Sequence, residues 1–326
     1  MAAMNRRAFV TGLGAVLAAS LAAGAQQAGK VWRIGLFHVG LDHVPPSLDG
    51  LRDGLKTRGY EEGRNIRLDF RNLADEDAAR VTARDFVREK VDLIVAFEPQ
   101  TVRAAKAATP TIPIVFLHVH DPVAHGFVAS MDRPGGNLTG FGQFGDFGPK
   151  RLQILKTIAP ATRQVLTLVA VDEPTVAEGL ATLREAAASL NCELIERQVR
   201  DQSDIERVFA SLKTGDVQAV FIAGETLVTK FPSLIIRLAL ERKLPISLHR
   251  KEWAHRGALF SYGADYLAMG RDAARLVDQI LRGARPSDLP VELVTKVELV
   301  INLKTATALG LTIPPSLLLR ADQVIE

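Results

Sequence analysis

The sequence predicts an α/β fold built from two similar, doubly wound parallel-sheet domains. From Val31 onward, short apolar runs alternate with amphipathic stretches, a pattern typical of parallel strands joined by helices. The order of elements then repeats at a nearly constant offset, because Ile34 and Leu166 lie 132 positions apart and Pro113 and Pro245 also lie 132 apart. The length of 326 residues is about twice that of a usual domain. Two βα domains joined by a hinge account for these observations.

The first series of elements runs from Val31 to His118. Its helix over 47–58 is expected to end at Gly59, since glycine readily adopts the positive φ found after a helix. Its helix over 99–108 begins at Pro99, whose missing N–H would have no partner in a first turn. The other predicted elements are strands over 31–37, 65–70, 92–97 and 112–118 and a helix over 76–89.

The second series begins after Pro149. It predicts helices over 150–158, 174–190, 203–212, 227–242 and 266–282, and strands over 164–171, 193–199, 219–223, 245–248, 258–261, 291–294 and 297–301. The segment Arg133–Gly142 is rich in glycine, cannot be helical and is predicted as a crossover between domains. We expect one lobe to comprise residues 30–141 plus about 263–295, and the other 142–262 plus about 296–326. If the chain crosses between the two lobes several times at one narrow region, that region would form a hinge.

The N-terminal segment has the pattern of a cleavable secretory leader over residues 1–25. Arg6 and Arg7 precede an apolar stretch that ends in the small-residue site Ala23–Ala25. The paired arginines are also compatible with a twin-arginine route. A retained N-terminal anchor is the alternative, but the stretch is short and glycine-rich for a membrane span. We therefore expect a mature chain in the periplasm.

Composition excludes several function classes. The formal net charge of +3 falls to +1 without the leader, and no basic run with interleaved aromatic residues occurs, so we expect no nucleic-acid partner. Cys192 is the single cysteine, which excludes an intrachain disulfide and a thiolate metal cluster. No metalloprotease, nucleophile-elbow or P-loop motif is present, so we expect neither an enzyme nor a cofactor. The spacing Gly140-x-Gly142-x-x-Gly145 matches a dinucleotide loop, but it does not follow a first strand.

The densest group of potential metal ligands is His118, His120, Asp121 and His125. Two histidines two positions apart on a strand share a face, so a site with Asp121 is geometrically possible. Contact with an organic ligand or a place on the surface fits the same residues equally well, and we predict no metal.

The loops at the carboxyl ends of the predicted strands are the candidate ligand site, because open α/β sheets bind ligands there. The predicted ligand-binding residues are His38, Phe97, Glu98, Asp121, Asp172, Glu225, Ser261 and Tyr262. Helices predicted to begin at Pro99 and Pro174 favour an anion such as a carboxylate at their N-termini, and the acids favour an ammonium group. Each acid taken singly could instead cap a helix or lie on the surface.

The whole chain from about Val31 resembles the ABC-transporter substrate-binding family that includes the tryptophan- and tyrosine-type binding proteins, a type I periplasmic binding fold. The matching strings are Arg33–Leu36, Gly54–Tyr60, Ile112–Phe116, Asp121–Val123, Phe127–Gly140, Lys150–Leu152, Ser261–Gly263, Glu298–Ala306 and Leu311–Asp322. The chain departs from the family pattern at Phe97–Pro99, at His118 and His120, and at Ala223–Thr226. These departures leave the ligand open.

The resemblance implies a solute-binding component of an ABC importer that closes its two lobes over a small ligand, an amino acid or a related amine or aromatic compound. One lobe would hold the ligand with Phe97, Glu98 and Asp121, and the other would close with groups near Asp172, Glu225 and Tyr262. The expected partners are the membrane permease subunits, and we expect a monomer. The alternatives are a ligand sensor for a membrane receptor and an enzyme on the same scaffold.

Overall fold

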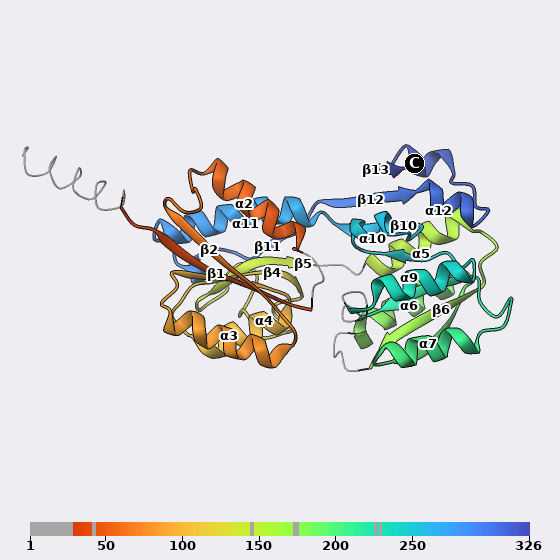
Figure 1. Cartoon of the computed structure of the whole chain (residues 1–326), viewed down its shortest axis with the longest axis horizontal. Coiled ribbons are helices and arrows are strands. Elements are labelled where there is room, and N and C mark those ends of the chain that lie inside the picture. The colour runs from red at the N-terminus through yellow and green to blue at the C-terminus, as the bar shows by residue number, and fades with distance from the viewer. Residues whose placement is uncertain (1–28, 41–43, 144–146, 172–175, 225–226, 228–229) are drawn as a thin grey trace, which may run out of the picture.

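The computed structural model describes residues 29–326 except 41–43, 144–146, 172–175, 225–226 and 228–229. Figure 1 shows two lobes side by side along the longest axis of the molecule. We call the part around a six-stranded sheet the N-lobe, and the part around a three-stranded and a four-stranded sheet the C-lobe. The predicted α/β class with parallel-strand sheets is confirmed.

The N-lobe sheet has the strand order β11-β5-β4-β3-β1-β2, and the pairings between these strands are parallel. Parallel neighbours end at the same edge of a sheet, so β1, β3 and β4 present their last residues close together. The strands are β1 (Trp32–Val39), β2 (Ile66–Leu73), β3 (Leu93–Phe97), β4 (Ile114–His120), β5 (Leu138–Gln143) and β11 (Glu292–Leu293).

Helices cover both faces of the N-lobe sheet (Figure 1). Successive residues of β1 point to opposite faces, so Ile34 and Leu36 pack in one apolar cluster and Phe37 packs in another. The first cluster includes α2 (Pro46–Thr57) and α11 (Tyr266–Leu281), and the second includes α3 (Glu76–Arg88) and α4 (Pro99–Ala108). A short 3-10 helix, Pro286–Asp288, contacts β5.

The C-lobe holds two sheets that share one apolar core. The parallel order β7-β6-β8 is linked to the second sheet by a bridge between Val220 and Ile246. The second sheet has the order β13-β12-β10-β9, in which β12 runs antiparallel to β10. The strands are β6 (Gln164–Ala170), β7 (Glu193–Val199), β8 (Ala219–Ala223), β9 (Ser247–Leu248), β10 (Phe260–Ala264), β12 (Val297–Asn302) and β13 (Gln323–Ile325).

The C-lobe helices surround these sheets. They are α5 (Phe147–Ile158), α6 (Val176–Ser189), α7 (Gln202–Ser211), α9 (Pro232–Glu241), α10 (Lys251–His255), α12 (Leu303–Ala308) and α13 (Pro315–Leu318). Asn302 shows how one of them is fixed, because its side-chain oxygen accepts a hydrogen bond from Thr305 N at 2.9 Å and its Nδ2 donates to Ala254 O at 2.8 Å. This single buried amide caps α12 and ties it to α10.

Two described connections between the lobes lie side by side. β10 of the C-lobe leads into α11 of the N-lobe, and β11 of the N-lobe leads into β12 of the C-lobe. Asp265 N donates to Lys296 O at 3.0 Å, and the Asp265 carboxylate lies 2.8 Å from Lys296 Nζ. Burial acts to raise the pKa of Asp265, but the Lys296 ammonium and the Ala268 N–H outweigh it and lower the pKa below its ordinary value. These two adjacent connections, which we call the waist, are therefore joined by a backbone hydrogen bond and an ion pair between Asp265 and Lys296.

Strand β5 corrects the prediction that Arg133–Gly142 is a crossover. Leu138–Gln143 instead pairs with β4 inside the N-lobe sheet. The glycine-rich composition of this segment does not indicate a strand. At Gly140, however, the strand requires glycine, because a Cβ there would lie 2.1 Å from Phe116 O, next to the point where the β4–β5 register shifts. Gly140 and Gly142 therefore belong to a strand, and the third glycine of the dinucleotide-like spacing, Gly145, lies outside the described residues.

The predicted helix over 227–242 is also wrong in its extent. Leu227 and Lys230 are helical, but Phe231 has a φ of −127° and α9 begins only at Pro232. Proline lacks an N–H and crowds the residue before it, so the helix restarts there. The prediction of strand 258–261 is shifted, since β10 begins at Phe260 and continues to Ala264. The prediction also missed α10, α12, α13 and β13.

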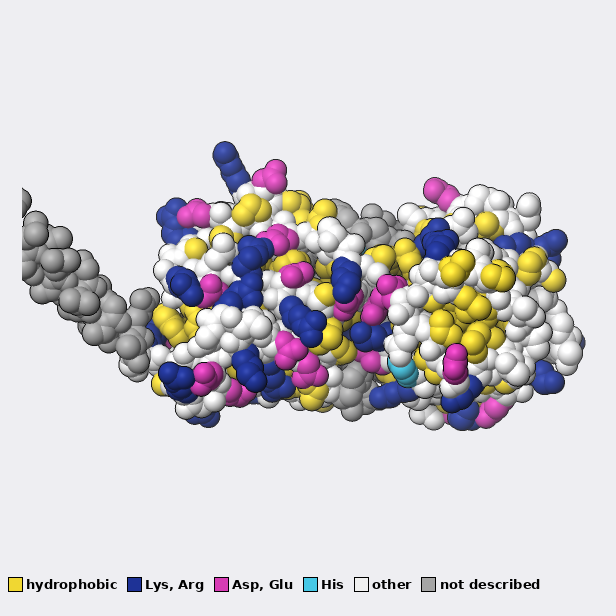
Figure 2. All heavy atoms as spheres, turned by 90° about the horizontal axis from the view of Figure 1, so that it is seen from above, with side chains coloured by type: hydrophobic (Ala, Val, Ile, Leu, Met, Phe, Trp, Pro, Cys, Tyr) yellow, Lys and Arg dark blue, Asp and Glu magenta, His cyan; other side chains and the backbone are white. Residues whose placement is uncertain are grey.

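The surface differs between the lobes when seen from above. Figure 2 shows Lys and Arg side chains interleaved with Asp and Glu over the N-lobe, and hydrophobic side chains gathered over the C-lobe. Among the ion pairs of the N-lobe, Arg271 of α11 lies 3.1 Å from Asp53 of α2, and Arg282, which follows α11, lies 2.7 Å from Asp278. Among the described residues, the structure contains no helix with the length and apolar character of a membrane span.

Candidate binding site

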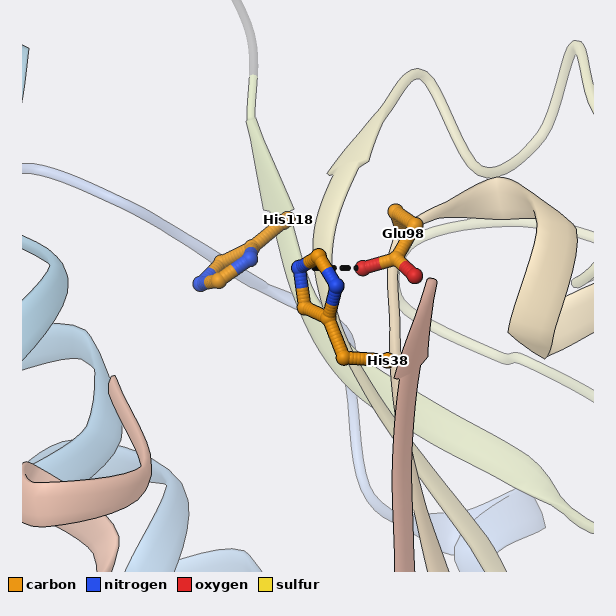
Figure 3. A group of neighbouring side chains, drawn as sticks. All are labelled: His38, Glu98 and His118. Atoms are coloured by element: carbon orange, nitrogen blue, oxygen red, sulfur yellow. Dashed lines mark ion pairs between the residues drawn. The ribbon is translucent and has the colours of Figure 1, made fainter. Parts of the chain in front are cut away.

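The carboxyl ends of β1, β3 and β4 bring three chemically active side chains together. His38 is the second-to-last residue of β1, and Glu98 directly follows β3. His118 lies two residues before the end of β4. One nitrogen or oxygen atom from each lies within 4.8 Å of one from each of the others. Figure 3 shows the His38 and Glu98 side chains facing each other, with His118 beside His38. His38 and Glu98 are among the ligand-binding residues that the sequence predicts, and His118 belongs to the group of potential metal ligands noted in the sequence.

His38 and Glu98 form the buried centre of this group. His38 Nε2 lies 2.8 Å from Glu98 Oε2, and the second carboxylate oxygen accepts a hydrogen bond from Val39 N at 2.7 Å. Burial raises the pKa of Glu98, and this effect exceeds the opposing influence of His38, the Val39 N–H and Arg250. A carboxylate in such a place is costly unless a positive group accompanies it.

The backbone at this edge adopts uncommon conformations. Glu98 has a φ of 64°, His118 a φ of 56° and Asp121 a φ of 38°, although residues with a Cβ rarely enter this region. Such conformations cost free energy and are typically retained where a side chain must be aimed at a site. The Thr101 hydroxyl stabilises the turn by donating to the carbonyls of Phe97 and Glu98. The conformations support the choice of this edge as the functional one.

Aromatic rings enclose the polar group. The Phe97 ring is fully buried and lies 6.0 Å from His38 and 5.7 Å from His118, measured between ring centroids. Tyr266, at the first turn of α11, meets the edge of His118 at 4.6 Å. The Phe97 ring therefore packs beside both histidines and is also part of the apolar core of the N-lobe.

The C-lobe contributes a buried cation that sequence analysis missed. The Arg250 side chain follows β9, its residue is 4% exposed, and its guanidinium lies 4.8 Å from the Tyr266 ring centroid. Arg250 Nε donates to His249 Nε2 at 3.3 Å, and the His249 ring lies 6.4 Å from Tyr266. Arg250 lies two residues after the end of the predicted strand over 245–248, and a place near a strand end is the same signal that selected the other candidates.

The other predicted residues occupy different places. Asp121 accepts a hydrogen bond from Ala124 N at 2.9 Å and so stabilises its own turn. Ser261 is 1% exposed in β10, and the next residue, Tyr262, meets the Phe147 ring edge-on at 5.9 Å. Asp172 and Glu225 lie outside the described residues.

A separate hollow lies between the lobes. Its volume is about 530 Å³, and residues of both lobes line it: Gly40 and Asn72–Ala74 from the N-lobe, and Gln202 and Lys230–Leu234 from the C-lobe. This volume falls within the usual range for small-molecule sites. None of the six described residues among the predicted site is part of this lining.

The comparisons with known proteins agree with this architecture. Residues 37–325 match the model of the ABC transporter substrate binding protein family, and the chain belongs to that family. It is 31% identical over 271 residues to a tyrosine-binding protein of Clostridioides difficile, an alignment that covers 82% of this chain and 78% of that protein.

Solved structures are similar over nearly the whole chain. One, the ABC domain in complex with L-Trp from Streptococcus pneumoniae, has a TM-score of 0.80 and 25% identity and covers 91% of this chain and 100% of that one. Another, the ligand-free, open structure of a substrate binding protein with adhesive properties from Clostridium difficile, has a TM-score of 0.68 and 27% identity and covers 90% and 99%. The predicted family and its type I periplasmic binding fold are confirmed.

Proposed function

We propose that this protein is the solute-binding component of an ABC importer, acting in the periplasm. It takes up a small ligand between its lobes, closes over it by bending at the waist, and delivers it unchanged to the membrane permease subunits. The protein makes and breaks no bond of the ligand, and energy for transport comes from a separate ATPase. The observation that carries this proposal is a ligand-sized hollow with walls from both lobes, in a member of the substrate-binding family.

Several features support lobe closure. The two described connections between the lobes are adjacent in space, joined by the Asp265–Lys296 pair, so bending can be concentrated in a few residues. Lys251 and Glu298, which lie 3.3 Å apart, continue this pairing on the C-lobe side. Each lobe has its own apolar core, so each can move as a unit while its core stays buried.

An amino acid, or a related amine or aromatic compound, is the ligand class that we propose. The named relatives concern tyrosine and L-tryptophan, which combine a carboxylate, an ammonium group and an aromatic ring. Lys230 on one wall of the hollow suits the carboxylate, while Phe231 beside it and Leu73 opposite offer apolar contact.

Calorimetric titration with amino acids, polyamines and aromatic acids tests the proposal. We expect one ligand per chain, and we expect Asn72→Ala and Lys230→Ala, from opposite walls, to weaken it at least tenfold. Leu319→Ala is the matched control, because Leu319 is 88% exposed and is absent from the lining. Small-angle scattering should show a smaller radius of gyration with the bound ligand. Absence of binding across the panel, or a chemically altered ligand, would overturn the proposal.

A further inference from the structure

His38, Glu98 and His118 form a donor set that the proposed uptake of an organic ligand does not explain. Two imidazoles and one carboxylate are ligands that zinc and its neighbours in the first transition row accept. They are also the one such trio found among the described residues. We propose that these three side chains bind a divalent transition-metal ion, of which Zn²⁺ is the representative, at the N-lobe edge (Figure 3).

The spacing of the donor atoms is close to that of a metal site. Ligand atoms around a tetrahedral zinc ion with bonds of about 2.1 Å lie about 3.4 Å apart. Here His38 Nε2 and Glu98 Oε2 are 2.8 Å apart, and one ligand atom from each of the three residues lies within 4.8 Å of one from each of the others. A metal ion would require the first two atoms to move apart and the His118 donor atom to lie at the same spacing from both.

The orientation of His38 is that of a metal ligand. Its Nδ1 lies 2.9 Å from the Val39 carbonyl oxygen, which can only accept, so the proton of the neutral ring belongs on Nδ1. In that neutral tautomer the Nε2 lone pair faces Glu98 Oε2 at 2.8 Å. Two lone pairs that face each other repel, and either a second proton on the imidazole or a metal ion shared by the two atoms removes this repulsion. Metal-binding histidines commonly donate their other N–H to a backbone carbonyl in this way.

The same residue also orients the carboxylate. Val39 N donates to Glu98 Oε1 at 2.7 Å, which leaves Oε2 as the oxygen presented to His38. Val39 thus holds two of the three proposed ligands, one through its N–H and one through its C=O. The third, His118, is held between the Phe97 and Tyr266 rings at 5.7 and 4.6 Å. Support of this kind is what distinguishes a built site from polar residues that happen to be close.

Charge sets a condition on the site. One carboxylate leaves a bound dication with a net charge of +1, and Arg250 adds a positive charge that acts on Glu98. An anion from solution in the remaining coordination position would therefore be favoured. The rival group of His120, Asp121 and His125 does not converge in this way, since Asp121 serves its own turn and the His125 ring stacks on Phe127 at 5.2 Å.

The test uses the untagged full chain, stripped with a chelator and titrated calorimetrically with Zn²⁺ and with Co²⁺. We expect one equivalent of each metal to bind, and Co²⁺ to give visible absorption bands of a low-coordinate site. Glu98→Gln and His118→Gln should weaken binding at least tenfold. His125→Gln and His255→Gln should bind as the wild type does, and they control for loss of any histidine.

Glu98→Gln also guards against a failure to fold. The new amide can accept from Val39 N and donate to His38 Nε2, so its thermal midpoint without metal should equal or exceed that of the wild type. Zn²⁺ should raise the midpoint of the wild type and leave that of the variant unchanged. Absence of Zn²⁺ binding, undiminished binding in Glu98→Gln, or loss of binding in His125→Gln would overturn the proposal. Amino-acid titrations of the chelated protein test the transport function separately.

Discussion

The two lobes carry different kinds of side chain at their facing ends. The N-lobe presents His38, Glu98 and His118, which are polar, largely buried and partly held in uncommon backbone conformations. The described part of the C-lobe presents Arg250 and the Tyr262 ring, on segments that flank β9 and lie in β10. The difference shows that the polar centre is built on the N-lobe and that the C-lobe places a buried cation beside it.

The two helices that support this polar centre, α2 and α11, pack very closely against each other. Helices α2 and α11 cross so closely that a Cβ on Gly270 would lie 2.0 Å from Ser47 O, and one on Gly50 would lie 2.0 Å from Leu267 O. Backbone atoms on both sides cannot give way as a flexible side chain can. Tyr266, which contacts His118, lies in the first turn of α11, so the position of the site depends on this helix pair.

Gly270→Val should have the largest effect, because it forces α2 and α11 apart. We expect a loss of about 3 kcal/mol or more in the free energy of unfolding, at the upper end of what overpacking costs. Urea unfolding followed by circular dichroism measures it. Gly29→Ala is the control, since nothing lies within 4 Å of the added Cβ there, and it should be neutral. If Gly270→Val unfolded with the same free energy as the wild type, α2 and α11 would not be packed as closely as the structure shows.

Arg250→Met tests the contribution of the C-lobe. The variant keeps an unbranched side chain but removes the guanidinium that lies over Tyr266, and we expect a loss of about 2 kcal/mol, as for a desolvated cation–π contact. Denaturant titration provides the value. Arg237→Met, at an exposed position on α9, should cost far less. Equal effects of the two substitutions would show that the lobes do not meet through Arg250.

Tyr60→Phe probes the far end of the same helix pair. The Tyr60 hydroxyl donates to Asp278 Oδ1 at 2.9 Å, and its loss should cost about 1 kcal/mol. Burial, together with Asp278, raises the pKa of Tyr60 to about 12. The hydroxyl therefore stays protonated through the neutral range, and the cost of the substitution should be the same at pH 6 and pH 9. A cost that changes between these two pH values would exclude this hydrogen bond as its source.

Asp265→Asn addresses the waist and should have the smallest effect, about 0.5 kcal/mol at neutral pH, because Lys296 is mostly exposed. The folded-state pKa of Asp265 is lowered, so its ionised form stabilises the fold above the ordinary value of 3.8 and loses this effect as the pH falls through the folded pKa. The difference between variant and wild type should therefore vanish in acid. Urea unfolding at pH 7 and at pH 3 compares the two, and a difference that is larger at pH 3 than at pH 7 would contradict the assignment.

Sequence patterns predicted those elements that obey one simple period. The helix over 99–108 matches α4 at both ends, and the strands over 193–199 and 219–223 match β7 and β8. Patterns failed where tertiary contacts override local preference. Strand β5 has the composition of a loop because β4 approaches its backbone at Gly140 too closely for a side chain. In the candidate site, the position at the end of a strand selected His38 and Glu98 as predicted ligand-binding residues but did not select Arg250.

The sequence by itself determined the α/β class, the alternation of strands and helices and the family, because periodicity and motif strings are local properties of the chain. Only the tertiary structure decided that His38, Glu98 and His118 meet, since the sheet order β4-β3-β1 sets which strand ends are neighbours. It also decided that Arg250 of the other lobe reaches Tyr266 beside them. Residues between 16 positions apart, as for Arg250 and Tyr266, and 80 positions apart, as for His38 and His118, come together through strand pairing and lobe packing, and local sequence does not record either.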